Sequence, residues 1–555
     1  MNATATLTET AALTDSTPVP WLTVLWLLPA VASVVVMLLP ADRGDNAKKV
    51  GLGAALLTLV WAVVVATEFS SNAGGFQLVE DVSWIPAFGA RYTLALDGVG
   101  LALILLTAVL TPILLLAGWR DADPGDTGPS SRARRVHIYV ALMLAVEAMV
   151  LMSFVATDVL MFYIFFEAML VPMYFLIGGF GRATEEVRSR AAVKFLLYNL
   201  FGGLIMLAAV IGLYVVSARS GLGPDGNGTF DFTELAAAAA NGRLDASSTT
   251  LNLLFLGFLF AFAVKAPLWP LHAWLPDAAV STTPAAAVMM MAVMDKVGTF
   301  AMLRFCIGLF PDASATFAPW ISALAVVSIV YGAVCAIGQR DVMRLIAYTS
   351  ISHFGFIVLG VFALTTQGQS GSALYMVNHG LSTAALFLIA GFLVSQRGSA
   401  LIADYGGVQK IAPVLAGTFL IAGLATLSLP GLAPFVSEFL VVIGTFTRYP
   451  VAAIIASSAL VLSAVYILWT YQRMMGGPER LSATVDAAST PPIRDLDLRQ
   501  KAVVAPLLVG LLVLGFFPRL VLDYIDPAVA ANPVEMMCVN AECTPVADAD
   551  EGGRP

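Results

Sequence analysis

Residues 251–270 read LNLLFLGFLFAFAVKAPLWP, an apolar run that is interrupted near its end by one charge and two prolines. A run of this length is sufficient to cross the ~30 Å hydrocarbon core of a bilayer as a helix. Lys265 lies inside the run, shortly before Pro267 and Pro270. Proline within a helix removes a backbone hydrogen bond and produces a kink, and broken helices are tolerated in membranes where they line a polar cavity. The stretch therefore predicts a broken membrane helix that carries a buried ionisable group.

The whole chain shares the apolar character of this stretch. It has 555 residues, of which 59% are hydrophobic and 12% are charged, so it is too apolar for a soluble protein of this length. We expect helices, because an isolated span must satisfy its own backbone hydrogen bonds and the two-residue alternation of a membrane barrel is absent. The predicted fold is an all-α membrane bundle of about fourteen transmembrane helices. The expected spans are residues 21–39, 50–68, 99–118, 137–154, 157–178, 192–216, 251–270, 282–304, 317–337, 342–364, 372–395, 412–445, 452–472 and 502–519.

The basic residues predict the orientation of the chain. Of the 29 Lys and Arg residues, 20 fall in loops that follow odd-numbered spans and 7 fall on the opposite side. Because cytoplasmic loops are enriched in Lys and Arg, both termini are expected on the outer side. Cys538 and Cys543 would then face a compartment that permits disulfides, and whether they form one is left open. The alanine-rich composition suggests a bacterial origin, and we expect the chain in a bacterial inner membrane.

A second broken span is predicted at LPGLAP, residues 429–434, five spans after the first. Two broken spans at this spacing favour two repeats of five spans, residues 137–304 and 305–472, which must be inverted relative to each other. Residues 1–136 would form an N-terminal segment with three spans. Residues 473–555 would form a cytoplasmic loop, the last span and an outer tail. The alternative is that both breaks are ordinary proline kinks.

Ionisable residues recur at depths where they are costly. Each one at a helix centre costs roughly 2.5–3.5 kcal/mol on insertion scales. Those within spans are Glu147, Glu167, Lys265, Asp295, Lys296, His353, His379 and Glu438, and Asp158 and Asp277 lie nearer span ends. A single such residue can be explained as one member of a structural ion pair, or as a long side chain whose charged end reaches the membrane surface. A row spread over several spans instead indicates a proton path.

Glu167 and Lys265 form the expected switch in the first half of this path. Burial disfavours the charged form of each side chain, and pairing restores it. Separating the two would make the lysine release its proton. Lys296, near the middle of the next expected span, could receive that proton. Its neighbour Asp295 lies about 100° round the helix and is expected to point elsewhere.

Two histidines and a carboxylate continue the path in the second half. Histidine is the side chain whose ordinary pKa best suits proton transfer near neutrality. His353 and His379 lie between Lys296 and Glu438 in chain order. A lone histidine in a span can also be a hydrogen-bonded core group. Two of them in this order favour a relay that ends at Glu438.

Other site classes are not indicated by the sequence. Residues 221–226 fit the pattern GxGxxG, but they follow a membrane span instead of a strand. We find no phosphate-cradling loop, catalytic triad or clustered metal ligands, so we expect no cofactor and no metal in this chain. The net charge of −8 is spread thinly and suggests no nucleic-acid partner. The chain by itself does not look like a redox enzyme.

Several of these stretches together resemble one family, the antiporter-like M-type subunits of bacterial NADH-quinone oxidoreductase (respiratory complex I), whose mitochondrial counterpart is the chain-4 subunit. The resemblance covers the fourth to the twelfth expected span. The matching stretches are LDGVG (96–100), DVLMFYIFFEAMLVPMYFLIG (158–178), FAVKAPLWPLHAWLPDA (262–278), DKVGTFAMLRF (295–305), RDVMRLIAYTSISHFGF (340–356), NHGLSTAALF (378–387) and LPGLAPFVSEFL (429–440).

The resemblance implies roles for the residues that match family positions. Glu167 and Lys265 would be the switching pair, and Lys296 would be the central relay. NADH, FMN, iron–sulfur clusters and quinone would be held by partner subunits. Other complex I membrane subunits, including sister antiporter-like subunits, and the lipid bilayer would surround this chain.

For the second half, the resemblance implies that His353 and His379 continue the polar axis and that Glu438 ends it. Sister subunits usually carry lysine at the last place, so Glu438 favours the M type. Glu147 resembles a glutamate of the fourth span, and Asp158 is a possible supporting group. Two alternatives remain: a subunit of a multisubunit cation/proton antiporter, and a structural membrane subunit without its own proton path.

Overall fold

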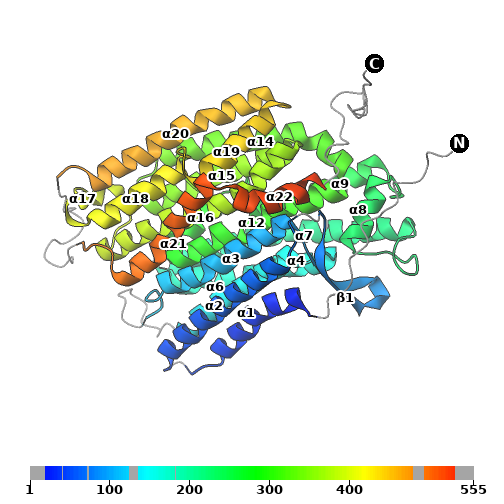
Figure 1. Ribbon diagram of the computed structural model, residues 1–555, viewed down its shortest axis with the longest axis horizontal. Coiled ribbons are helices and arrows are strands. Elements are labelled where there is room, and N and C mark those ends of the chain that lie inside the picture. The colour runs from blue at the N-terminus through cyan, green and yellow to red at the C-terminus, as the bar shows by residue number, and fades with distance from the viewer. Residues whose placement is uncertain are drawn as a thin grey trace, which may run out of the picture.

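The computed structural model describes residues 19–40, 42–71, 74–123, 136–181, 183–478 and 493–531. The predicted Cys538–Cys543 pair lies outside these residues. The chain is a bundle of roughly parallel and antiparallel helices (Figure 1). Within the described residues, twelve helices are long and apolar enough to cross a membrane, and three shorter apolar helices accompany them. The predicted membrane bundle is confirmed, and the division into fourteen crossings and two inverted repeats stays a prediction.

The N-terminal part contains a feature that hydropathy did not predict, a two-stranded antiparallel hairpin before helix α3. Its turn passes through Gly89, whose φ of 64° suits glycine. The hairpin lies at the same end of the bundle as α8 (Figure 1). The elements are α1 (Trp21–Met37), α2 (Gly44–Glu68), β1 (Gln77–Ile85), η1 (Pro86–Phe88), β2 (Ala90–Leu96) and α3 (Gly98–Ala117).

The next part holds the first predicted broken helix. The chain leaves α9 at Lys265 and forms α10 only at Leu275, so the predicted break is confirmed. The elements are α4 (Val136–Val155), α5 (Val159–Ala168), α6 (Leu170–Phe180), α7 (Glu185–Arg219), α8 (Phe232–Ala240), α9 (Ser248–Lys265), α10 (Leu275–Ser281), α11 (Pro284–Val288), the π-helical turn η2 (Met289–Met294), α12 (Lys296–Ala301), the π-helical turn η3 (Met302–Cys306) and α13 (Ile307–Leu309).

The second predicted break is also confirmed, because α18 stops at Thr426 and α19 starts at Ala433. Ser428 within the break has a φ of 61°, a left-handed conformation that few non-glycine residues adopt. The elements are α14 (Pro311–Ile337), α15 (Val342–Phe362), α16 (Thr366–Arg397), η4 (Ile402–Asp404), α17 (Val408–Ile411), α18 (Pro413–Thr426), α19 (Ala433–Phe446), α20 (Pro450–Met475), α21 (Leu498–Phe516) and α22 (Arg519–Ala530).

Burial separates inner from outer helices. The apolar windows of the Pro284–Leu309 segment and of α16 are 100% buried inside the chain, and that of α15 is 94% buried. The corresponding windows of α2, α20 and α21 are only 28%, 33% and 22% buried. The outer helices therefore present apolar side chains to lipid or to neighbouring subunits. The inner helices are the ones that carry Lys296, His353 and His379, so these groups lie in the centre of the bundle.

Candidate functional site

Lys265 occupies the last position of α9, where the helix breaks. Its ammonium Nζ donates to the backbone carbonyl of Phe166 at 2.5 Å and lies 3.6 Å from the centre of the Phe166 ring. The C-terminal end of a helix carries partial negative charge, which favours a cation there. Trp274 donates to the Val264 carbonyl at 3.0 Å and so satisfies one of the carbonyls that the break releases. The local structure therefore holds Lys265 at a fixed place on the first half of the path.

Glu167 lies next to Phe166 on α5, so the predicted pair is brought together. Its carboxylate interacts electrostatically with Lys265, but it makes no ion pair, and neither oxygen has a hydrogen-bond partner in the part of the chain that the structure describes. Gly203 of α7 faces the carboxylate so closely that an added Cβ would lie 2.1 Å from Oε1. The pair is thus present in an open arrangement, with Lys265 bonded to the residue beside its partner.

Lys296 begins α12, directly after the π-helical turn η2. Its Nζ lies 2.5 Å from Nδ1 of His379 and donates to the Met291 carbonyl at 3.2 Å. It also lies 4.2 Å from the centre of the Phe354 ring. π-helical turns inside α-helices are often found at functional sites. The contact with His379 joins the central lysine directly to α16. The relay expected from chain order has His353 as the next group after Lys296.

The histidines lead from Lys296 toward the second broken helix. The His353 and His379 rings are 5.3 Å apart, and Nε2 of His379 lies 3.1 Å from the Thr383 hydroxyl. His353 faces the end of α18 at Thr426. Both histidines are almost completely buried, at 4% and 0% exposure. They are therefore adjacent core groups and not isolated ones.

Tyr375 fills the space between the histidines and Glu438, and sequence reasoning did not select it. Its ring lies 5.9 Å from His353 and 6.4 Å from His379, and its hydroxyl faces Ser428 and Glu438. Ser428, in the break of the second broken helix, donates to the Glu438 carboxylate. The available signal was the spacing of four residues between Tyr375 and His379, which places both on one face of a helix.

Asp158 has a clear structural task at the start of α5. Its carboxylate accepts hydrogen bonds from the backbone N–H groups of Met161 and Arg91, each at 2.9 Å, and so caps α5 and ties it to β2. Burial raises the pKa of Asp158 to about 6. Glu147 is fully buried in α4 and faces Thr111 of α3. The supporting proton-transfer roles of Asp158 and Glu147 stay predictions.

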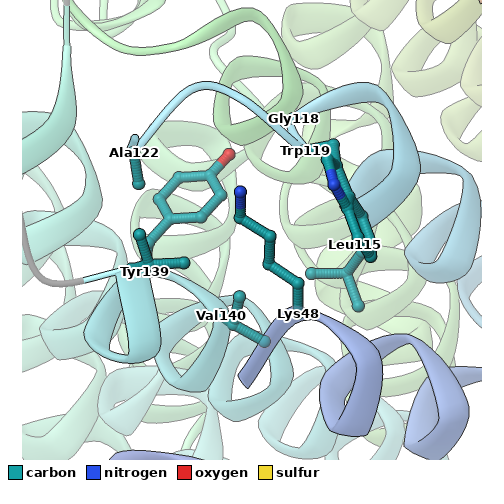
Figure 2. A pocket seen from close by; sticks show the side chains of 8 residues that line it. Lys48, Leu115, Gly118, Trp119, Ala122, Tyr139 and Val140 are labelled. Carbon is teal, nitrogen blue, oxygen red and sulfur yellow. The ribbon is translucent and has the colours of Figure 1, made fainter. Parts of the chain in front are cut away.

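Cavities in the described part of the chain also lie apart from these groups. A small one of about 10 Å³ has room for one water and lies between α2, α3 and α4. Figure 2 shows the Lys48 side chain there, extended between Tyr139 and Trp119. Lys48 forms an ion pair with Asp123. A larger cavity of about 240 Å³ is lined by residues of α3, α11, α16 and α21, with Arg120, Asp121 and Gln396 among its polar groups. It lies toward the ends of the two helical segments that carry Lys296 and His379.

Residues 156–463 match the family described as NADH:quinone oxidoreductase/Mrp antiporter, TM. The chain belongs to this family. The matched range contains every residue of the predicted path from Glu167 to Glu438.

Individual members of the family are also similar to the chain. NADH-quinone oxidoreductase subunit M of Mycobacterium tuberculosis is 61% identical over 530 residues, which cover 92% of this chain and 93% of the relative. A chain of respiratory complex I from Thermus thermophilus with bound NADH has a TM-score of 0.77 and 31% identity, over 92% of this chain and 99% of that one. A chain of the Mrp complex from Dietzia has a TM-score of 0.79 at 23% identity, over 92% of this chain and 97% of that one. This likeness shows that the two chains share a fold. Both solved matches are chains of multisubunit membrane assemblies.

The predicted resemblance to the M-type subunits is therefore confirmed, as is the antiporter-like fold. No group of three or more His, Cys, Asp or Glu side chains that could hold a metal ion occurs among the residues that the structure describes. The individual roles of the site residues stay predictions.

Proposed function

We propose that this chain is the proton-translocating M-type subunit of an NADH-quinone oxidoreductase and that it moves protons along a buried axis. The observation that carries the proposal is the 2.5 Å contact between Lys296 and His379, which joins the two halves of the predicted path in the core of the bundle. The similarity to subunit M over 92% of the chain supports the assignment to this complex. Proton transfer needs groups within hydrogen-bond reach, directly or through one water.

The axis begins at the Glu167–Lys265 pair. Lys265 is held by the Phe166 carbonyl and not by the Glu167 carboxylate, so closing the pair requires movement of at least one of the two side chains. Closing favours the charged form of Lys265, and opening favours release of its proton. A charge that arrives in a neighbouring subunit would shift this balance.

From Lys265 the proton passes to Lys296 and then to His379. His353 and Tyr375 continue the route, and Glu438 ends it. The two broken helices supply Lys265 at one end and Ser428, the hydrogen-bond donor to Glu438, at the other. Broken helices of this kind are the usual frame of transport sites near the midplane of a membrane.

The electron-transfer chemistry belongs to partner subunits in this proposal. NADH, FMN, iron–sulfur clusters and quinone would be bound there, and this chain would hold no redox centre. The chain would lie in a bacterial cell membrane with both termini outside. Residues 137–304 and 305–472 would be the two inverted repeats, between an N-terminal segment, residues 1–136, and a C-terminal segment, residues 473–555.

Replacement of Lys265 by Met tests the proposal. The variant keeps the length of the side chain but cannot carry a proton, so NADH-driven proton translocation should fall strongly while the complex still assembles. Lys410→Met is a control, because Lys410 is exposed in the short helix α17, away from the axis. Unchanged proton translocation by the assembled Lys265→Met complex would contradict the proposed path.

A subunit of a multisubunit cation/proton antiporter is the second candidate, because the fold is also that of an Mrp complex chain. Gentle purification of the tagged chain from its native membrane separates the two. Recovery within an NADH-oxidising assembly supports the complex I subunit. Recovery with membrane subunits alone, without NADH oxidation, supports the antiporter.

A further inference from the structure

Asp295 is a buried acid that the proposed axis does not use. It is 0% exposed, and among the described residues neither of its carboxylate oxygens has a hydrogen-bond partner. A buried carboxylate without such a partner is costly. Asp295 lies between the π-helical turn η2 and α12, immediately before Lys296. Asp295 is therefore a buried acid whose role depends on the groups that it faces.

The packing of α12 shows that Asp295 faces the broken end of α9. Gly298, three residues further on, touches that end so closely that an added Cβ would lie 3.0 Å from the backbone N of Ala266 and 3.0 Å from the carbonyl O of Phe262. Residues three apart lie on the same face of a helix. Lys265, which ends α9, is adjacent to Ala266. Asp295 is thus directed toward the part of α9 that carries Lys265.

Lys296 points in a different direction from the same turn. Its Nζ contacts His379 of α16 and the ring of Phe354 of α15. The backbone N–H of Asp295 bonds to the carbonyl of Met290, five residues earlier, at 2.9 Å. Asp295 and Lys296 are consecutive residues, so their side chains point about 100° apart round the helix axis. The acid faces the first half of the bundle, and the lysine faces the second half.

Electrostatic contact supports this placement. The Asp295 carboxylate interacts with both Lys265 and Lys296, although it forms an ion pair with neither in the described part of the chain. Lys265 in turn interacts with two acids, Glu167 and Asp295. The two lysines of the axis therefore both interact with the same acid.

We propose that Asp295 carries the proton from Lys265 to Lys296. The inference rests on the proposed function and adds a residue to its central step. An N–H bond of the Lys265 ammonium breaks and an O–H bond forms on Asp295, which leaves a neutral amine and a neutral carboxylic acid. The O–H bond then breaks as the neutral Lys296 amine takes the proton, and Asp295 regains its negative charge. Both steps conserve atoms and charge and need no further reactant, with water able to bridge the remaining gaps.

Asp295→Asn and Asp295→Glu, built in the whole complex, test this carrier. Asparagine has nearly the same shape but cannot take up a proton, so NADH-driven proton translocation should fall by about 10²-fold or more, since a proton-transfer group typically contributes about 10²–10⁴-fold. Glutamate should restore most of the rate. Infrared difference spectra of the complex during NADH turnover should show a protonated carboxyl band that shifts in D₂O, is lost in Asp295→Asn and moves in Asp295→Glu.

The outcomes separate this inference from the proposed function. If Lys265→Met abolishes proton translocation but the assembled Asp295→Asn complex translocates protons like the wild type, the carrier role is wrong and the function stands. If no carboxyl band depends on residue 295, Asp295 is a fixed counter-charge only and the inference fails. Should Asp295→Asn not assemble, the infrared band of Asp295→Glu decides, because an unmoved band also contradicts the proposal.

Discussion

Gly203→Ala is a sharp test of how the Glu167–Lys265 pair works, because it perturbs the glutamate without changing it. The added Cβ would lie 2.1 Å from Oε1, 2.2 Å from Cδ and 2.4 Å from Oε2 of Glu167. Cβ contacts under 3.0 Å are essentially never seen. Oε1 must therefore move by at least 0.9 Å, the difference between this 3.0 Å limit and the 2.1 Å contact. The glutamate side chain is flexible enough to make this movement.

The expected effect is large on proton transfer and small on stability. A displacement of about 1 Å at a reacting group can cost about 10²-fold in rate. Overpacking costs about 1–3 kcal/mol, and the change from glycine to alanine inside a helix returns about 1 kcal/mol. The net destabilisation should therefore be at most about 2 kcal/mol, and the complex should assemble.

The assay is NADH-driven proton translocation per electron in inverted membrane vesicles, with assembly followed by native electrophoresis. Gly179→Ala is the matched control, since Gly179 also lies in a helix, α6, and an added Cβ there would meet no atom within 4 Å. Full proton translocation by an assembled Gly203→Ala complex would refute the reasoning that the position of the Glu167 carboxylate controls the pair.

Three further predictions concern other groups of the bundle. Tyr375→Phe removes the hydroxyl that faces Glu438 and should slow proton translocation about 10²-fold or more. Tyr139→Phe, at a buried tyrosine of α4, is the control and should leave the rate unchanged. Equal rates in both variants would remove Tyr375 from the axis. Arg304→Gln breaks a 2.6 Å ion pair between buried Arg304 and partly buried Asp97. The change should cost at most about 3–5 kcal/mol, the value for a fully buried pair, seen as a lower unfolding temperature or lost assembly. Burial raises the pKa of Asp158 from 3.8 to about 6, so the stability that its protonated form contributes is lost as the pH rises between these values. Asp158→Asn should remove this pH dependence from the thermal unfolding temperature. An unfolding temperature that varies with pH as in the wild type would contradict the prediction.

Hydropathy and charge identified most of the architecture because both are local properties. A helix in a bilayer satisfies its own backbone, so each long apolar run predicts a span without knowledge of its neighbours. The prolines near Lys265 and at residues 429–434 predicted the two breaks for the same reason. The hairpin of β1 and β2 was missed because it pairs segments outside the spans, where hydropathy gives no signal.

The sequence alone determined the membrane class, the broken helices and the set of buried ionisable residues. The free energy of placing an apolar run or an ionisable residue in the membrane, or a proline in a helix, depends on that residue and its immediate neighbours in sequence. Only the tertiary structure decided which of these groups meet. The packing of α9, α12 and α16 places Lys265 against the Phe166 carbonyl, Lys296 against His379, and Asp295 toward α9. The rotation of about 100° per residue predicts that Asp295 and Lys296 point in different directions, but it does not say which helices the two side chains face. Contacts between residues distant in sequence depend on how whole helices pack, and no single stretch of sequence encodes that packing.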